Sequence, residues 1–225
     1  MLSRPDSGRI AAREQDVTYP VVLDSDYSIW NAFRNQYWPA VYLVDAQGRV
    51  RHEQFGEGDY DRVESIIRQL LAEAGHAVSP SQLVAATGDG AEAAADWNNL
   101  RTPETYVGSA HGENFAARLS GKWAIRREFA VSQAANGKVS YRFHARDVHL
   151  VMGPATRGTP IRFRVSIEGR PPGDSHGLDI EADGQGKIVE PRMYQLIRQP
   201  GPISDRQIEI EFLDPGAQVF VFTFG

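Results

Sequence analysis

The sequence predicts an α+β protein of two domains, a small α/β unit over residues 1–75 and an all-β jelly-roll sandwich over residues 106–225. Three observations predict this division. Short apolar strands and an amphipathic helix fill the first part, and residues 76–105, rich in Ala, Ser, Gly, Pro and Asp, are typical of a connection. From residue 106 onward the apolar residues recur with a period of 2, which is typical of strands.

The first domain is predicted to alternate short strands with helices. Apolar, β-branched runs predict buried strands at 19–24 and 40–45, with a short helix at 27–35 between them. Gly48 marks the turn of a hairpin that follows the second strand. A weaker helix is predicted over residues 3–15.

The last helix of this domain is its clearest element. Over residues 59–75 the apolar residues follow the i, i+3, i+4, i+7 spacing of a helix that buries one face. They are Tyr60, Val63, Ile66, Ile67, Leu70 and Leu71. Asp59 is the expected N-cap and Gly75 the expected stop.

Three segments carry the prediction of a sandwich in the second domain. Residues 161–169 and 207–214 alternate apolar and polar side chains, as strands with one buried face do. Residues 218–225 are apolar on both faces, which predicts a central strand. Pro and Gly clusters separate these runs at the intervals typical of a β-sandwich.

The apolar period breaks within residues 138–153. Tyr141, Phe143 and Ala145 share one parity, whereas Val148, Leu150 and Met152 share the other. A continuous strand cannot bury both sets on one face, so a β-bulge or a sheet-switching corner is expected near Arg146–Asp147. Four candidate ligand or catalytic residues surround this corner: His144, Arg146, Asp147 and His149. The alternative is a structural polar corner in which Arg146 pairs with Asp147 and the imidazoles are hydrogen-bonded.

Composition excludes several functions. The chain has 24 basic and 29 acidic residues without a basic stripe, which argues against nucleic acid or an anionic membrane as a partner. No apolar run reaches the ~20 residues that span a bilayer, so no membrane insertion is expected. The chain has no cysteine, and dithiol–disulfide exchange needs a thiolate, so its own residues cannot perform that reaction.

Residues 179–190 resemble a calcium-binding loop. Asp179, Glu181, Asp183 and Glu190 fall on the spacing that arranges oxygen ligands around Ca²⁺. The flanks, however, are predicted strands, and an acidic hairpin turn explains the same residues. No cofactor is therefore expected from the sequence, and Ca²⁺ at this loop is the alternative.

Four aromatic residues are candidates for stacking on sugar rings, because the ring face of Trp or Tyr suits the C–H face of a pyranose. They are Trp97, Tyr106, Trp123 and Tyr194. Core packing is the alternative for each of them, and Trp97, in the connection, is the one most expected to be exposed.

Several segments in order resemble one known family. They are residues 19–75, TPETYVG (102–108), ENFA (113–116), YRFHARDVHLVMGP (141–154), MYQLIRQPGP (193–202) and IEFLDPGAQVFVFTFG (210–225). Together they resemble the C-terminal region of DipZ-type thiol–disulfide exchange proteins of cytochrome c biogenesis. That resemblance implies a partial thioredoxin-like (redoxin) α/β unit, followed by a sandwich similar to carbohydrate-binding modules.

The resemblance also implies a cis peptide bond at Trp38–Pro39, on the loop that faces the C-x-x-C pair of thioredoxin-like proteins. Here that pair is absent, together with the first strands and helix of the redoxin unit. The open sheet edge that results predicts a homodimer or a partner chain. The family implies a periplasmic location, although the N-terminus lacks the apolar core of a signal peptide, which leaves the cytoplasm open.

Three functions compete on this basis. The first is a non-catalytic binding protein that recognises a glycan or the cell envelope through its sandwich and carries a redox-inactive redoxin remnant. The alternative is an accessory part of a thiol–disulfide oxidoreductase, whose cysteines lie on another segment or chain. The third, a hydrolase that uses the His/Asp corner, has the least support because no nucleophile–base pair is evident.

Overall fold

A computed structural model describes residues 12–13, 17–56, 58–78, 82–84, 93–111 and 117–225. The chain divides into two compact units, Met1–Val84 (unit 1) and Ala85–Gly225 (unit 2). Most of the predicted helix at 3–15 and the ENFA segment lie outside the described residues.

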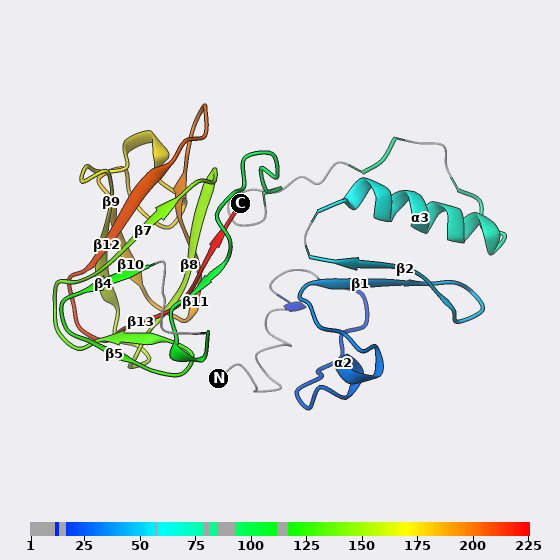
Figure 1. Ribbon diagram of the computed structural model, residues 1–225, viewed down its shortest axis with the longest axis horizontal. Helices are drawn as coiled ribbons and strands as arrows, with labels where there is room; N and C mark the ends of the chain where they lie inside the picture. Colours follow the sequence, from blue (N-terminus) through cyan, green and yellow to red (C-terminus); the bar gives the residue numbers. More distant parts are fainter. Residues whose placement is uncertain (1–11, 14–16, 57, 79–81, 85–92, 112–116) are drawn as a thin grey trace. The chain divides into compact units, whose positions relative to one another are not determined.

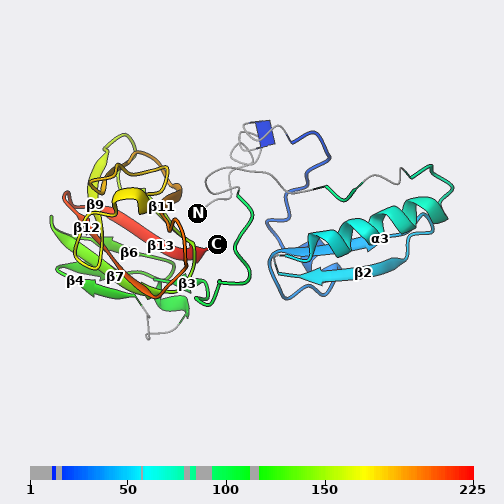
Figure 2. The ribbon, with the colours of Figure 1, turned by 90° about the horizontal axis from the view of Figure 1, so that it is seen from above.

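The described part of unit 1 includes a two-stranded sheet and the helices α2 and α3 (Figure 1). The elements are α2 (Ser28–Ala32), β1 (Ala40–Val44), β2 (Val50–Phe55) and α3 (Tyr60–Glu73). β1 and β2 form the predicted antiparallel hairpin, and α3 runs along it in both views (Figures 1 and 2). Gly48 adopts a positive φ of 79° in the turn. Asp45 accepts the N–H groups of Gln47 and Arg49 there, and the bond from Arg49 N–H leads in lowering the pKa of the Asp45 carboxyl.

The predicted helix at 59–75 is confirmed, and its two ends differ in how they are capped. Asp59 precedes α3 in a left-handed conformation, and its side chain makes no capping hydrogen bond. At the other end Gly75 has a φ of 82° and donates to Ala72 O, while His76 donates to Leu71 O. These two bonds make up a Schellman motif, which explains why a glycine stops the helix at this position.

The predicted strand at 19–24 is wrong. This segment forms no ladder in the structure, and the side chains of Tyr19, Val21, Val22 and Leu23 are exposed. A strand needs a neighbour to pair its backbone groups, and the described part of unit 1 provides only the β1–β2 hairpin. The apolar sequence of a buried strand is present, but the sheet that would bury it is not among the described residues.

Unit 2 is a β-sandwich of two antiparallel sheets, as predicted from residue 106 onward (Figures 1 and 2). The first sheet has the order β10-β9-β12-β7-β4. The second has the order β11-β8-β13-β6-β5, and β3 pairs with β13. The strands are β3 (Thr105–Tyr106), β4 (Arg118–Ser120), β5 (Trp123–Ile125), β6 (Ala130–Ser132), β7 (Gly137–Phe143), β8 (Asp147–Pro154), β9 (Ile161–Ile167), β10 (Gln185–Ile188), β11 (Arg192–Arg198), β12 (Arg206–Phe212) and β13 (Ala217–Phe224). Two short 3₁₀ helices, η2 (Ser109–His111) and η3 (Gly173–Ser175), lie in the connections.

The hydrophobic core of the described chain lies in unit 2. Both sheets contribute large, fully buried side chains to it. They include Phe143, Phe163 and Phe212 from the first sheet, and Leu150, Met152, Tyr194 and Phe222 from the second. Burying a side chain of this kind contributes about 1.5–3 kcal/mol, so the sandwich has the driving force to fold.

The break in apolar period is a sheet-switching corner, one of the two predicted explanations. β7 belongs to the first sheet and β8 to the second, and residues 144–146 join them. The chain therefore changes layers between Phe143 and Val148, and both side chains face the same core from opposite sides. The core lies on opposite faces of the chain in the two sheets. The set of alternate residues that is buried therefore changes between β7 and β8 without a slip in strand register.

Candidate functional site

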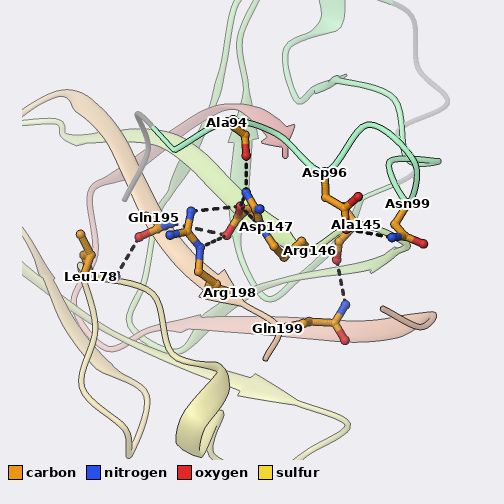
Figure 3. Close-up of polar contacts among 10 residues, drawn as sticks. All are labelled: Ala94, Asp96, Asn99, Ala145, Arg146, Asp147, Leu178, Gln195, Arg198 and Gln199. Atoms are coloured by element: carbon orange, nitrogen blue, oxygen red, sulfur yellow. Dashed lines mark hydrogen bonds and ion pairs between the residues drawn. The ribbon is translucent and has the colours of Figure 1, made fainter. Parts of the chain in front are cut away.

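Asp147, the first residue of β8, is the centre of the corner (Figure 3). Its carboxylate is 1% exposed and accepts hydrogen bonds from two guanidinium groups. Arg146 reaches Oδ2 with Nε at 2.9 Å, and Arg198 of β11 reaches Oδ1 with Nε at 2.7 Å. Gln195 Nε2 lies 3.5 Å from Oδ1. A buried carboxylate between two arginines is paired and hydrogen-bonded, as burial of a charge requires.

The same corner holds several distant backbone segments (Figure 3). Arg146 also donates to the Ala94 carbonyl at 2.7 Å, and Gln199 Nε2 donates to Ala145 O at 2.8 Å. The Asp147 N–H donates to Gly225 O at 2.8 Å. Arg198, Gln195 and Gln199 were missed by the sequence reasoning, although MYQLIRQPGP contains all three. These hydrogen bonds hold separate segments of the chain together at the corner. Among the residues named, none forms a nucleophile–base pair.

Hydrogen bonds to the corner show that the second unit begins before residue 106, the start predicted from the sequence. Arg101 N–H donates to His144 O at 3.0 Å, and His144 N–H donates to Thr102 Oγ1 at 2.6 Å. Residues at 94 and 101–102, predicted to belong to a connection over 76–105, are thus part of unit 2. The composition of this segment is that of a linker, but its backbone is hydrogen-bonded to the corner.

The four predicted corner residues do not converge. Arg146 and Asp147 pair as the structural alternative predicted, whereas His144 Nδ1 lies 2.6 Å from Asp205 Oδ1, just before β12 of the first sheet. Hydrogen bonds from His144 and then from Arg142 hold the pKa of the Asp205 carboxyl below its usual range. The chain changes layers between His144 and Asp147, so the two side chains leave toward different sheets.

His149 lies on β8 in register with Gln195 on β11 and Thr223 on β13. It is 7% exposed, and its Nε2 is buried without a hydrogen-bond partner among the described residues. The predicted hydrogen-bonded imidazole is therefore wrong at this atom. Burial disfavours the charged ring and lowers the pKa of His149 below its ordinary value of 6.5, against the opposing effect of Asp147.

Acid is expected to destabilise unit 2 through His149. Below pH 6.5 the unfolded chain binds a proton at this residue before the folded chain does, so the free energy of unfolding falls as the pH falls through this range. Urea unfolding at pH 7.5 and pH 5.5 measures the loss. His149→Gln is expected to reduce this loss, and an equal loss in the His149→Gln variant would contradict the assignment.

The predicted calcium loop does not form. Among the described residues, no group of three or more His, Asp or Glu side chains is arranged to hold a metal ion. Asp179 instead accepts from Arg192 and from the Gln195 N–H at 2.7 Å, and Asp183 accepts the Gln185 N–H at 3.0 Å. Gly184, with a φ of 86°, lies where an added Cβ would collide with the Val165 carbonyl oxygen. Gly184 is therefore required by a tight turn, and the predicted acidic hairpin explains the sequence. Glu181 and Glu190 do not join Asp179 and Asp183 in a ligand set.

The four predicted stacking residues divide into two pairs. Tyr194 is fully buried, and its hydroxyl donates to Glu190 O at 2.8 Å, so its proposed role in stacking is wrong. Trp123 packs edge-on against Phe212 and belongs to the border of the core. Trp97, 45% exposed, and Tyr106, 38% exposed, have accessible rings.

The loop before β1 has the geometry that the resemblance implied. The Trp38–Pro39 bond is cis, and Trp38 is 72% exposed. Its ring centroid lies 5.0 Å from that of Trp30 and 6.5 Å from that of Tyr27. An aromatic surface therefore adjoins the proline.

The edge of β1 next to this loop is open. Within the described residues β1 pairs only with β2, which leaves the backbone groups of its other edge without a strand partner. A groove of about 290 Å³ lies between this strand and α3, lined by Leu43 and Val44 and by Ile67, Leu70 and Leu71 of the helix. Unit 1 thus presents a sheet edge and an apolar groove together. No helix in the described part of the chain is long and apolar enough to cross a membrane.

In chain order, a hairpin–helix unit with a cis-proline loop precedes a β-sandwich, the order expected for the C-terminal region of a thioredoxin-like protein. The chain belongs to the family described as thioredoxin like C-terminal domain, whose model matches residues 102–225. The chain is 32% identical to Protein DipZ of Mycobacterium tuberculosis over 232 residues, which cover 93% of this chain and 30% of DipZ. It is 40% identical over 70 residues to the thiol-disulfide oxidoreductase YkuV of Bacillus subtilis, covering 30% of this chain and 47% of YkuV.

These findings confirm the resemblance to DipZ-type proteins. The chain spans less than half the length of these curated relatives. Among solved structures, a family two carbohydrate esterase from Cellvibrio japonicus matches with a TM-score of 0.40 and 10% identity, over 54% of this chain and 32% of the esterase. A likeness at this level has no bearing on the ligand.

Proposed function

We propose that this chain supplies the cis-proline side of a thiol–disulfide exchange protein whose cysteines lie on another segment or chain. The observation that carries the proposal is the position of the open β1 edge beside the cis Trp38–Pro39 loop. The chain has no cysteine, so any thiolate must come from elsewhere. We propose that the reaction takes place outside the cytoplasm, and the family resemblance supports this location.

The surface of unit 1 favours a polypeptide as the missing partner. A free strand edge pairs with an incoming strand through main-chain hydrogen bonds, and pockets beside the edge select its side chains. Here the groove beside the edge is apolar, and Ile67 and Leu71 project from α3 with more than a third of each side chain exposed. A strand added to β1 would pass under this helix face and cover it.

Glycan binding through unit 2 has less support from the geometry. Two of the four predicted stacking residues, Trp123 and Tyr194, serve the core instead. The exposed rings of Trp97 and Tyr106 remain as its basis. The calcium loop predicted at residues 179–190 does not form and so adds no support.

Adding a cysteine-bearing redoxin segment in trans tests the proposal. The partner is the stretch of M. tuberculosis DipZ that directly precedes its match to this chain, which by the resemblance carries the C-x-x-C pair. We expect a one-to-one complex in light scattering. With the C-x-x-C pair of the DipZ stretch supplied as the dithiol, which is oxidised to a disulfide in the exchange, we also expect the mixture to reduce a disulfide-linked fluorescent peptide faster than either chain alone. A mixture that neither associates nor reduces faster than the DipZ stretch would contradict the proposal.

Two helix variants serve as matched probes of the groove. Ile67→Glu places a charge in the groove, where desolvation opposes it, and is expected to weaken the complex about tenfold or more. Ser65→Glu adds the same residue to α3 outside the groove and is expected to leave the affinity unchanged. Light scattering of this chain alone shows whether a second copy occupies the edge instead.

A further inference from the structure

A second hollow, of about 410 Å³, lies in unit 2 where β9 ends and β12 begins. Its charged lining includes Arg170 and Arg206, and Ser175 adds a hydroxyl. Pro171, Pro172 and Ile167 provide apolar walls. The volume is in the range of small-molecule sites, about 300–1,000 Å³.

Arg206 occupies an unusual place for a charged residue. It shares the parity of Ile208 and Ile210 on β12, whose side chains are fully buried in the core. Because side chains alternate along a strand, Arg206 leaves β12 on the core-facing side, at the rim where the core ends. The sequence reasoning began this strand one residue later and missed the arginine, although its spacing from Ile208 carries the signal.

Two carboxylates near the hollow, those of Glu168 and Asp205, are already engaged. Glu168, which lines it, accepts the Gln207 N–H at 2.8 Å, and Asp205 is held by Arg142 and His144. Within the described residues, neither Arg170 nor Arg206 forms an ion pair with a carboxylate. The hollow thus presents two guanidinium groups whose charge no described carboxylate neutralises by direct contact.

The walls of the hollow are preorganised by local backbone structure. Glu168 and Gly169 both have positive φ, 50° and 73°, and form a two-residue hairpin turn in which Ile167 and Arg170 exchange hydrogen bonds of 2.8 and 3.0 Å. Two prolines follow directly and fix their own φ angles. A site with a rigid frame loses less entropy when it binds a ligand.

We propose that this hollow binds a small organic anion through a carboxylate or phosphate head group. The head group lies between the guanidinium groups of Arg170 and Arg206, each of which presents N–H donors in a fork that matches such oxygens. The carbon body lies against Pro171, Pro172 and Ile167. This site belongs to unit 2 and does not depend on the function proposed for unit 1.

Titration of the full chain with four probes, followed by ¹H–¹⁵N NMR, tests the site. The probes are phenyl phosphate, benzoate, inorganic phosphate and benzyl alcohol. We expect saturable shifts at Gly169, Ser175 and Gln207 with phenyl phosphate or benzoate, weaker binding of inorganic phosphate, which lacks the carbon body, and none with the neutral alcohol. The tighter of the two aromatic anions identifies the head group. Added salt is expected to weaken binding because the attraction is between charges at the surface.

Three variants assign the effect to the hollow. Arg206→Gln and Arg170→Gln each remove one guanidinium and are expected to weaken binding about tenfold. Arg164→Gln removes the same charge from an outward position on β9 that does not line the hollow, and is expected to leave affinity unchanged. Equal binding of benzyl alcohol and the anions, absence of binding by both aromatic anions, or full affinity in Arg206→Gln would overturn the proposal. The salt dependence of binding is measured on the unmodified chain, so this part of the test does not rely on any variant folding correctly.

Discussion

Asp147→Asn is expected to lower the free energy of unfolding of the β-sandwich by about 3 kcal/mol. Removing one partner of a buried ion pair leaves the other charge uncompensated, which costs about 3–5 kcal/mol. The lower end applies here because Arg146 and Arg198 keep 26% and 33% of their side chains exposed and can regain water. Urea unfolding followed by the methyl NMR signals of Leu150 and Leu196 in unit 2 measures the change.

Asp214→Asn is the matched control. Asp214 pairs with Arg162, but the two side chains are 30% and 62% exposed, and an exposed pair contributes about 0–1 kcal/mol. The same substitution should therefore have a small effect there. Equal losses in the two variants would show that burial of Asp147 between its arginines does not stabilise the corner.

Unit 1 is expected to exchange its amide hydrogens at least about 100-fold faster than the central strands of unit 2. No apolar side chain in the described part of unit 1 is buried, whereas β8 and β13 border a core of fully buried residues. A helix of 14 residues such as α3 is marginal in water without a packed face. Regions with few buried apolar contacts open at low free-energy cost, and hydrogen exchange read by mass spectrometry measures this directly.

The same measurement connects stability to the proposed function. When the preceding stretch of DipZ is added, protection in β1, β2 and α3 is expected to rise, because the partner strand would cover the groove and pair the open edge. Protection in β8 and β13 serves as the internal control and should not change. Strong protection of unit 1 without any partner would contradict the idea that its edge is incomplete.

The confirmed predictions share a local origin. Helical spacing predicted α3, and its glycine stop reflects backbone conformation at one residue. Alternation predicted β9 and β12, because the pleat of a strand assigns each side chain to a face. The change of parity between Phe143 and Val148 required a corner or a bulge for the same reason.

The wrong predictions concern partners distant in sequence. Asp179 is engaged by Arg192 and Gln195 across a strand pairing, so its spacing from Asp183 could not show that no calcium loop forms. Tyr194 and Trp97 are both aromatic, and only the packing of the two sheets buries the first and leaves the second exposed. Residues 19–24 have the composition of a strand but lack a neighbouring strand.

The sequence by itself determined that this chain contains a β-sandwich and a hairpin–helix unit, and that its own residues offer no thiolate. Those properties depend on side-chain type and on periods of two to seven residues, which any segment carries with it. Only the tertiary structure decided that His144 and Asp147 turn to different sheets, that Arg206 stands at the rim of the core, and that β1 is open beside a groove. The physical reason is that burial and pairing depend on strand order, register and layer, which are set by contacts between residues far apart in the chain.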